Sequence, residues 1–488
     1  FGSSHVGSLK FHVGGWAKPI GPPAMVGSPA SAFFVTAALL AICGGAFGAV
    51  VKFAVHKSAG GTSEEVTGTG QGRAPALLLT ISAGAAILVD TIVEVVTLPI
   101  LAHGAEGEFS VMLFFARPVL GFATTAVLFP LLRGRGTSAA KLSAAGLAML
   151  SLPWAAAALK LKPGFLVAFC YYWGAVASAL VKVPTLHALL QVDGSWAGWQ
   201  ACAIFYGALL GPSCSSWLSA STEKEPLMAL LVITGVLAAA VQLAVSDAAV
   251  PPPAEGEDSP EAFAPSDAGH LMAGVSVATL LLSVQAALVP LLLRSAAPPG
   301  TSPEITSIPV LAGLGLLLAS FLSRRLTARM AVLALAMASL AAALSLRSVV
   351  RSLAQARAGE LIFARLAQQL AIGGLVGIGT SLPTRIRFLA PPATARALQS
   401  CGIAAAAFFG EGLGLTLQLL LLPIIGAPLT LSTMALVPLL FAFALVLRMP
   451  MVGGCKNEEE DLCAPPSTPE VAGTKYVRGA STSGKAPT

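Results

Sequence analysis

The stretch ILVDTIVEVVTLPIL, residues 87–101, lies in a long apolar run and nevertheless contains two carboxylates, Asp90 and Glu94. A helix that spans a bilayer needs about 20 mostly apolar residues, and the surrounding run, 76–102, is long enough. A charge at membrane depth is costly, so such residues usually face a water-filled cavity or an ion partner. The stretch therefore predicts a transmembrane helix in which two acids have a structural or functional use.

The composition of the whole chain also favours a membrane environment. Of its 488 residues, 55% are hydrophobic and 11% are charged, and the mean hydropathy is +0.80. Soluble domains have roughly 25% charged residues, so a soluble chain of this composition would expose a large apolar surface. The formal net charge of +6 comes largely from loops and tails. Because the sequence contains no basic cluster interleaved with aromatic residues, it predicts no nucleic-acid partner.

Thirteen apolar segments are candidate membrane spans. They are 32–55, 76–102, 109–132, 142–159, 164–190, 197–220, 226–246, 271–293, 308–323, 330–346, 360–383, 398–424 and 430–447. The Pro- and acid-rich segment 246–270 divides the last twelve into two groups of six and is typical of a disordered surface loop. We therefore predict an all-α membrane protein with twelve transmembrane helices in two six-helix halves. Segment 32–55 is either an extra N-terminal span or part of a targeting leader.

These boundaries divide the chain into five parts. They are an N-terminal leader with a Gly/Ser linker (1–74), the first half (75–246), a central cytoplasmic loop (247–270), the second half (271–448) and a disordered tail (449–488). Basic turns occupy equivalent places in the two halves, FPLLRGRGTSAAKL and SFLSRRLTARMAVL, which indicates an internal repeat. The excess of basic residues on this side predicts that it is cytoplasmic. The residues expected to act in these gating turns are Arg133, Arg135, Arg324 and Arg325.

Three motifs resemble those of a known family. LVDTIVEVVTLPI places Asp90 nine residues before Pro99, and LFFARPVLGF carries Arg117. GALLGPSCSS has the helix-packing pattern GxxxGP, formed by Gly207, Gly211 and Pro212. In these motifs the chain resembles the major facilitator superfamily over roughly residues 76–448, and most closely its vesicular amine transporters and related drug:proton antiporters. The resemblance implies a secondary transporter whose two halves alternate access to a site near the membrane midplane.

Several departures from the family pattern leave other functions open. The RGRG turn lacks the usual Asp, and CYYWGAV lacks the Arg that usually opens the fourth helix. An Arg and a Gln occur instead in the tenth of the twelve body spans, 360–383, as Arg365 and Gln368. Where the amine transporters have an acid in helix eleven this chain has alanines, and Glu411 follows soon after. One alternative is therefore a scaffold or receptor with a degenerate transporter fold, and another is a facilitator of a neutral or anionic solute.

Charged residues at membrane depth form the candidate site. Asp90 and Glu94 are four residues apart, so they share one helix face, and at about 1.5 Å per residue Glu94 lies about 6 Å further out. Arg117 of the next span lies at a depth similar to that of Glu94. We therefore predict a structural Glu94–Arg117 ion pair and an unpaired, central Asp90. Because one carboxylate can hold either a proton or a cationic solute, we predict that Asp90 and Glu411 bind solute and protons.

Other polar residues carry weaker signals. Lys182 and His187, in the inner half of the fourth body span, are expected to be interfacial rather than ligands. The sequence has no GxxxxGK loop, no HExxH motif and no paired CxxC, so we predict no enzyme activity, no metal site and no cofactor. The expected partners are a small organic solute, protons and the lipid bilayer. We expect a monomer in the plasma membrane or in an organelle or vesicle membrane.

Overall fold

The computed structural model covers most of the two predicted halves. The described residues are 73–104, 108–133, 139–158, 163–220, 263–296, 310–386 and 392–448. The candidate spans 32–55 and 226–246, most of the central loop and the tail from 449 lie outside them. The predictions made for those segments, and the total of twelve membrane helices, therefore stay predictions.

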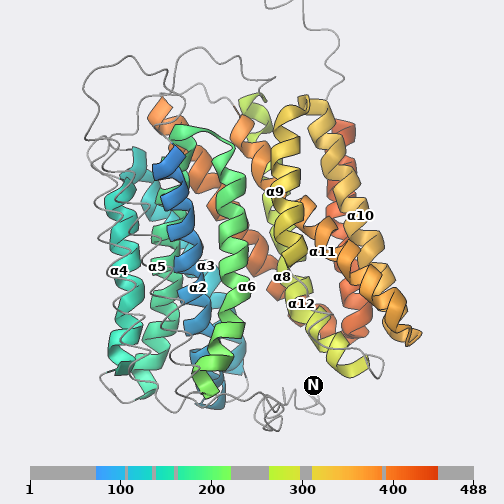
Figure 1. Ribbon diagram of the computed structural model, residues 1–488, viewed down its shortest axis with the longest axis horizontal. Helices are drawn as coiled ribbons and strands as arrows, with labels where there is room; N and C mark the ends of the chain where they lie inside the picture. The colour runs from blue at the N-terminus through green and yellow to red at the C-terminus, as the bar shows by residue number, and fades with distance from the viewer. Residues whose placement is uncertain are drawn as a thin grey trace, which may run out of the picture. The chain divides into compact units, whose positions relative to one another are not determined.

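The first half contains five helices within the described residues (Figure 1). They are α2 (Arg73–Gly104), α3 (Glu108–Arg133), α4 (Ala139–Ala158), α5 (Pro163–Val192) and α6 (Trp196–Ala220). Each begins and ends within a few residues of a predicted span, because an apolar run of this length forms one uninterrupted helix. Prolines lie inside α3 and α5, at Pro118, Pro130 and Pro184, without ending either helix.

The second half is also helical throughout its described residues. Its helices are α8 (Ala268–Ala296), α9 (Val310–Arg325), α10 (Ala328–Ala354), α11 (Ala358–Ser381) and α12 (Pro392–Arg448), with the short 3₁₀ helices η2 (Pro265–Asp267) and η4 (Leu382–Arg385). The long α12 covers two predicted spans. Its helical backbone is interrupted at Gly426, whose φ of 73° is a left-handed conformation that glycine adopts at little cost.

The membrane character of the chain can be checked on the helices themselves. Within the described residues, six helical stretches are long and apolar enough to cross a membrane. They are Tyr171–Val192, Ala268–Val289, Ala328–Ala354, Ala358–Arg385, Thr394–Gln418 and Leu420–Arg448. The prediction of an all-α fold with membrane-spanning helices is therefore confirmed for the part of the chain that the structure describes.

Close helix contacts in both halves depend on glycine. Gly207 of α6 lies directly against the carbonyl oxygen of Gly84 in α2, and a Cβ on Gly84 would come within 2.9 Å of the Ala203 carbonyl oxygen. Figure 1 shows α2 and α6 side by side. In the second half, Gly373 of α11 lies equally close to the carbonyl oxygen of Ala312 in α9. Small residues allow membrane helices to approach this closely.

The two halves also share a hydrophobic cluster. Its buried members come from α5, α6, α8 and α12, and they are Leu186, Ala197, Val275, Ile403 and Ala406. These residues lie towards the C-terminal end of α5, the N-terminal end of α6 and the N-terminal parts of α8 and α12. Because these helix ends all lie on the side predicted to be cytoplasmic, the halves are in contact on that side.

The last residues of the central loop are ordered, contrary to the prediction of disorder over 246–270. Phe263 is 5% exposed, and its backbone N–H donates to the carbonyl of Arg385 at 3.2 Å. The same residue forms a β-bridge with Ile386, and the Arg385 guanidinium lies 5.6 Å from its ring centroid. The polar composition of the loop concealed this contact, because one apolar side chain is enough to anchor a short segment.

Candidate functional site

A buried ion pair lies between three helices of the first half. Nη2 of Arg117, on α3, donates to Oδ1 of Asp90, on α2, at 2.6 Å, and the two side chains are 10% and 7% exposed. Nη1 of Arg117 donates to the backbone carbonyl of Tyr171, on α5, at 2.9 Å. The guanidinium also lies 4.9 Å from the centroid of the buried Tyr171 ring. A buried pair needs such additional contacts to compensate for the loss of hydration.

A glycine on α5 makes room for this pair. A Cβ at Gly174 would lie 2.6 Å from Oδ1 of Asp90 and 3.5 Å from Nη1 of Arg117. The first distance is shorter than any real Cβ contact, so any larger residue would displace the carboxylate. Gly174 is the glycine of the CYYWGAV stretch, and no sequence pattern pointed to its role. Its place in the site follows only from how α5 packs against α2.

The prediction of an unpaired Asp90 is wrong, because Arg117 binds this carboxylate. The depth estimate considered helix rise alone, and an arginine side chain is long enough to reach across more than one turn. The rotation of α3 and its packing against α5 therefore decide which acid it meets. The Glu94 side chain lies outside the described residues, so the predicted Glu94–Arg117 pair stays a prediction.

Glu411, the second acid predicted to bind solute, lies on an exposed part of α12. The next residue, Gly412, packs against Pro118, where an added Cβ would lie 3.3 Å from the Pro118 Cβ. Pro118 itself follows Arg117 in the chain. This contact therefore brings α12 of the second half next to α3 of the first, beside the buried pair.

A second polar cluster joins α8 and α11. Arg365 is 6% exposed, and its Nη1 donates to Oε1 of Gln368. Nε2 of Gln368 donates to Oε1 of Gln285, on α8, at 2.6 Å. Because a guanidinium can only donate, the orientation of both amides follows from Arg365. Asp90 and Gln285 are both in the seventeenth position after the first residue of α2 and α8, respectively, which places them at matching depths in the two halves.

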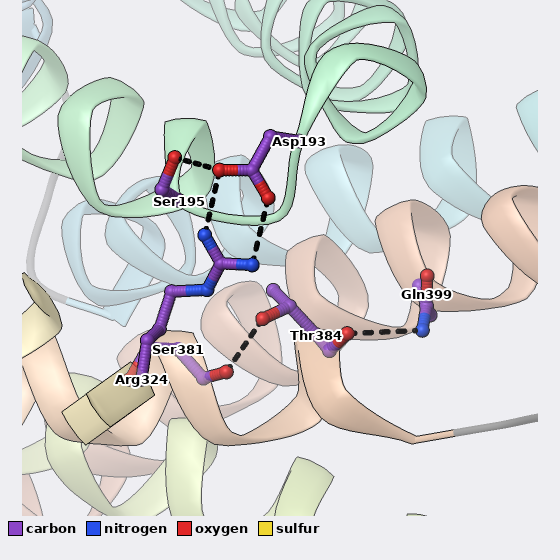
Figure 2. Close-up of polar contacts among 6 residues, drawn as sticks. All are labelled: Asp193, Ser195, Arg324, Ser381, Thr384 and Gln399. Atoms are coloured by element: carbon purple, nitrogen blue, oxygen red, sulfur yellow. Dashed lines mark hydrogen bonds and ion pairs between the residues drawn. The ribbon is translucent and has the colours of Figure 1, made fainter. Parts of the chain in front are cut away.

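An ion pair joins the two halves at the helix ends. Both terminal nitrogens of Arg324, at the end of α9, donate to the Asp193 carboxylate in the turn between α5 and α6, each at 2.7 Å. Ser195 donates a further hydrogen bond to Asp193 (Figure 2). We call these three residues the Asp193–Arg324 latch. Sequence analysis predicted Arg324 in a gating turn but missed Asp193, whose only signal is an acid in a short turn on the same side.

The latch carboxylate is held in its charged form. Partial burial alone would raise the pKa of Asp193, but the hydrogen bonds from Arg324 and Ser195 and the charge of Arg324 outweigh it. The pKa therefore lies below its ordinary value of 3.8. A bidentate guanidinium–carboxylate contact is also the best-defined geometry for such a pair. The latch is thus intact throughout the physiological pH range.

The segments around the latch are braced by backbone contacts. Nη1 of Arg385 donates to the carbonyls of Ser323 and Leu326, at 3.2 and 3.0 Å. Figure 2 shows two more hydrogen bonds nearby. The Thr384 hydroxyl donates to the Ser381 carbonyl at 2.7 Å, and the Gln399 amide donates to the Thr384 carbonyl at 3.4 Å. These bonds hold the end of α9, η4 and the start of α12 together.

The remaining predicted site residues that the structure describes lie apart from both clusters. The guanidinium of Arg325 lies 4.4 Å from the centroid of the Phe321 ring, on the surface, and Arg133 is exposed at the end of α3. Arg135 lies outside the described residues. Gly207 faces α2, as described above. Gly211 and Pro212 lie in the same helix, and their surroundings are outside the part of the chain that the structure describes. Within the described residues no cluster of His, Cys, Asp and Glu could hold a metal ion.

Comparison with known proteins identifies the fold. No family model matches the chain, and no curated protein matches it. The major facilitator proton:xylose symporter XylE, solved with 6-bromo-6-deoxy-D-glucose, is 14% identical with a TM-score of 0.55, covering 77% of this chain and 95% of its own.

Two structures of a bacterial homologue of the iron transporter ferroportin are also similar. The outward-facing structure is 13% identical with a TM-score of 0.51, covering 76% of this chain and 98% of that one. The same state with soaked iron is 13% identical with a TM-score of 0.52, covering 76% and 97%. At these identities the likeness establishes the fold and not the subgroup. The chain is an integral, multi-pass membrane protein with the major facilitator fold.

Proposed function

We propose that the protein is a secondary active transporter that exchanges protons for a small organic solute by alternating access, with Asp90 as the exchanging acid. The observation that supports this most directly is the buried Asp90–Arg117 pair, held among α2, α3 and α5 at 2.6 Å. Ionisable residues inside a membrane protein are rare, and they commonly mark ion and substrate pathways. The major facilitator fold supplies the two halves that alternating access requires.

The ion pair suits exchange because it can be broken in two ways. A proton on Asp90 removes the negative charge and releases Arg117 from its strongest contact. A cationic solute competes with Arg117 for the same carboxylate. Both ligands therefore bind the same group in turn, which is the simplest form of antiport. The Tyr171 carbonyl and ring hold Arg117 in place while Asp90 is occupied.

Alternating access also requires contacts between the halves that can form and break. The Asp193–Arg324 latch and the shared hydrophobic cluster join the halves on one side. Exchange of access requires these contacts to break. The Arg324 and Asp193 side chains are 32% and 46% exposed, so water can replace their hydrogen bonds when they separate. Such partly exposed pairs contribute about 0–1 kcal/mol, which is compatible with repeated opening.

One observation favours a second candidate function. Asp90 is neutralised by Arg117, and a buried pair of this kind can position helices without binding any ligand. If its role is structural, the protein is better described as a facilitator of a neutral or anionic solute. A facilitator would move solute without moving protons, so the two functions differ in a measurable way.

The test is transport by the purified protein in proteoliposomes. Amines, sugars and organic acids are screened for solute-dependent proton flux and for uptake driven by a pH gradient. We expect at least one class to move protons, and we expect Asp90→Asn to lose gradient-driven uptake. Glu360→Gln is the matched control, because Glu360 is an exposed acid that pairs with the exposed Arg357 at the start of α11. Monodispersity of each variant separates loss of coupling from loss of folding.

Each outcome decides between the functions. Full gradient-driven uptake by Asp90→Asn would reject the role of this acid in coupling. Solute movement without protons would favour the facilitator. If no solute moves and none drives a proton flux, the transport proposal is rejected and a scaffold or receptor remains.

A further inference from the structure

A histidine lies where the two halves meet, close to the end of α5. His187 is 4% exposed, and it precedes the last residue of α5, Val192, by five positions. Its ring lies beside Arg396, at the start of α12 in the other half. The Nδ1 atom is buried and has no hydrogen-bond partner among the described residues.

The surroundings of His187 are apolar and belong to both halves. One turn before it, Val183 packs with Ala397 and Cys401 of α12 in one buried cluster. Leu186, immediately before it, packs with Ile403 of α12 in another. We call this surface the α5/α12 contact. His187 is thus a titratable group inside the contact that must separate when the halves move apart.

The charged and titratable groups around this contact are mostly cationic. On the helices that contribute to the two clusters they include Lys182 on α5, Arg133 on α3, Lys141 on α4, His270 on α8, and Arg396 and the Cys401 thiol on α12. The Lys182 ammonium lies over an aromatic ring of α12, with Nζ 5.2 Å from the centroid of Phe408. The nearby acid, Asp193, is already bound by Arg324. No carboxylate within the described residues is placed to neutralise a protonated His187.

We propose that His187 is a proton-binding site between the halves, and that its protonation releases the α5/α12 contact. The neutral ring can be buried in this contact at a lower cost than the charged ring. A proton on Nδ1 would place an unsatisfied donor in an apolar environment and a positive charge beside Arg396. Both are costly when water is excluded. The protonated ring therefore favours the state in which α5 and α12 separate and water reaches Nδ1.

The same coupling acts in the opposite direction, because linkage between two equilibria is reciprocal. When the halves separate, His187 becomes hydrated and binds a proton with the ordinary histidine pKa of about 6.5. One proton bound only in the separated state increases the ratio of separated to joined molecules by about tenfold between pH 7.5 and 5.5. This inference rests on the proposed alternating access, since the separated state is one of its two conformations.

A native thiol reports the separation. Cys401 is 7% exposed and packs in the α5/α12 contact, so it reacts with N-ethylmaleimide only when that contact opens. The experiment uses the full chain in nanodiscs with the other six cysteines replaced. The labelling rate at each pH is divided by that of the same chain unfolded in detergent, which corrects for ionisation of an exposed thiol.

We expect the corrected rate to increase about tenfold from pH 7.5 to 5.5 and to stay flat in His187→Gln, which keeps a polar side chain at this position but binds no proton. His270→Gln, a histidine at the start of α8, is the matched control and should keep the increase. Arg396→Gln removes the neighbouring positive charge that opposes protonation of His187, so the increase should become smaller.

Two results would overturn the proposal: a flat rate in the parent protein, or the same increase in His187→Gln. Should His187→Gln not be monodisperse, an unchanged increase in Arg396→Gln also rejects the proposal. The labelling needs no solute. A failure to find solute-driven proton flux would therefore reject the proposed function, while the pH dependence of the contact would still be measured independently.

Discussion

Removal of the Arg117 guanidinium should strongly destabilise the protein. The variant Arg117→Met keeps an apolar side chain against the Tyr171 ring but leaves the Asp90 carboxylate buried without its 2.6 Å partner. At an effective dielectric constant of about 20, two charges about 4 Å apart attract each other by about 4 kcal/mol. Breaking a buried pair by removing one partner typically costs about 3–5 kcal/mol. We therefore expect the free energy of unfolding to fall by about 3–5 kcal/mol.

The assay is equilibrium unfolding by sodium dodecyl sulfate in mixed micelles, arranged as a double-mutant cycle. Asp90→Asn should also destabilise the protein, because it removes the charged partner at 2.6 Å from Arg117. The double variant should recover about 0.5–3 kcal/mol of the summed losses, the range found for residues in contact. Arg133→Met is the matched control, since Arg133 is exposed at the end of the same helix, and it should change stability by no more than about 0.5 kcal/mol.

The reasoning would be refuted if the effects of Arg117→Met and Asp90→Asn simply add. It would also be refuted if Glu94→Gln, rather than Asp90→Asn, restored stability to Arg117→Met. That second result would mean that Arg117 pairs chiefly with Glu94, as the depth estimate alone predicted.

Two further predictions concern helix packing and the latch. Gly207→Ala should cost about 1–3 kcal/mol in the same assay, because its Cβ would meet the Gly84 carbonyl, whereas Gly269→Ala meets no atom within 4 Å and should be neutral. The stabilisation that the protein gains from the Asp193–Arg324 pair should persist from neutral pH to about pH 4 and disappear as the pH falls through the lowered pKa of the Asp193 carboxyl. The measurement is the difference in unfolding free energy between the parent and Asp193→Asn across this pH range. A difference that is already lost near pH 6 would contradict the assignment.

The sequence by itself determined the fold class. The apolar runs predicted α2 to α6, α8, α9 and α11 within a few residues, while α10 extends past its predicted end at 346 to Ala354 and α12 begins before its predicted start at 398. The motif around Asp90 pointed to the major facilitator fold, which the structural comparisons support. This succeeded because hydropathy is a local property. Each run of about 20 apolar residues must satisfy its own backbone hydrogen bonds in lipid, so it forms a helix whatever its neighbours are.

The tertiary structure decided which polar groups meet. Arg117 binds the Asp90 carboxylate, and Arg324 binds Asp193, which is 131 positions away in the sequence. His187 lies beside Arg396 at the start of α12. None of these partners follows from helix depth. They depend on how each helix is rotated about its axis and on where glycines let helices approach, and rotation is set by packing between segments far apart in the chain.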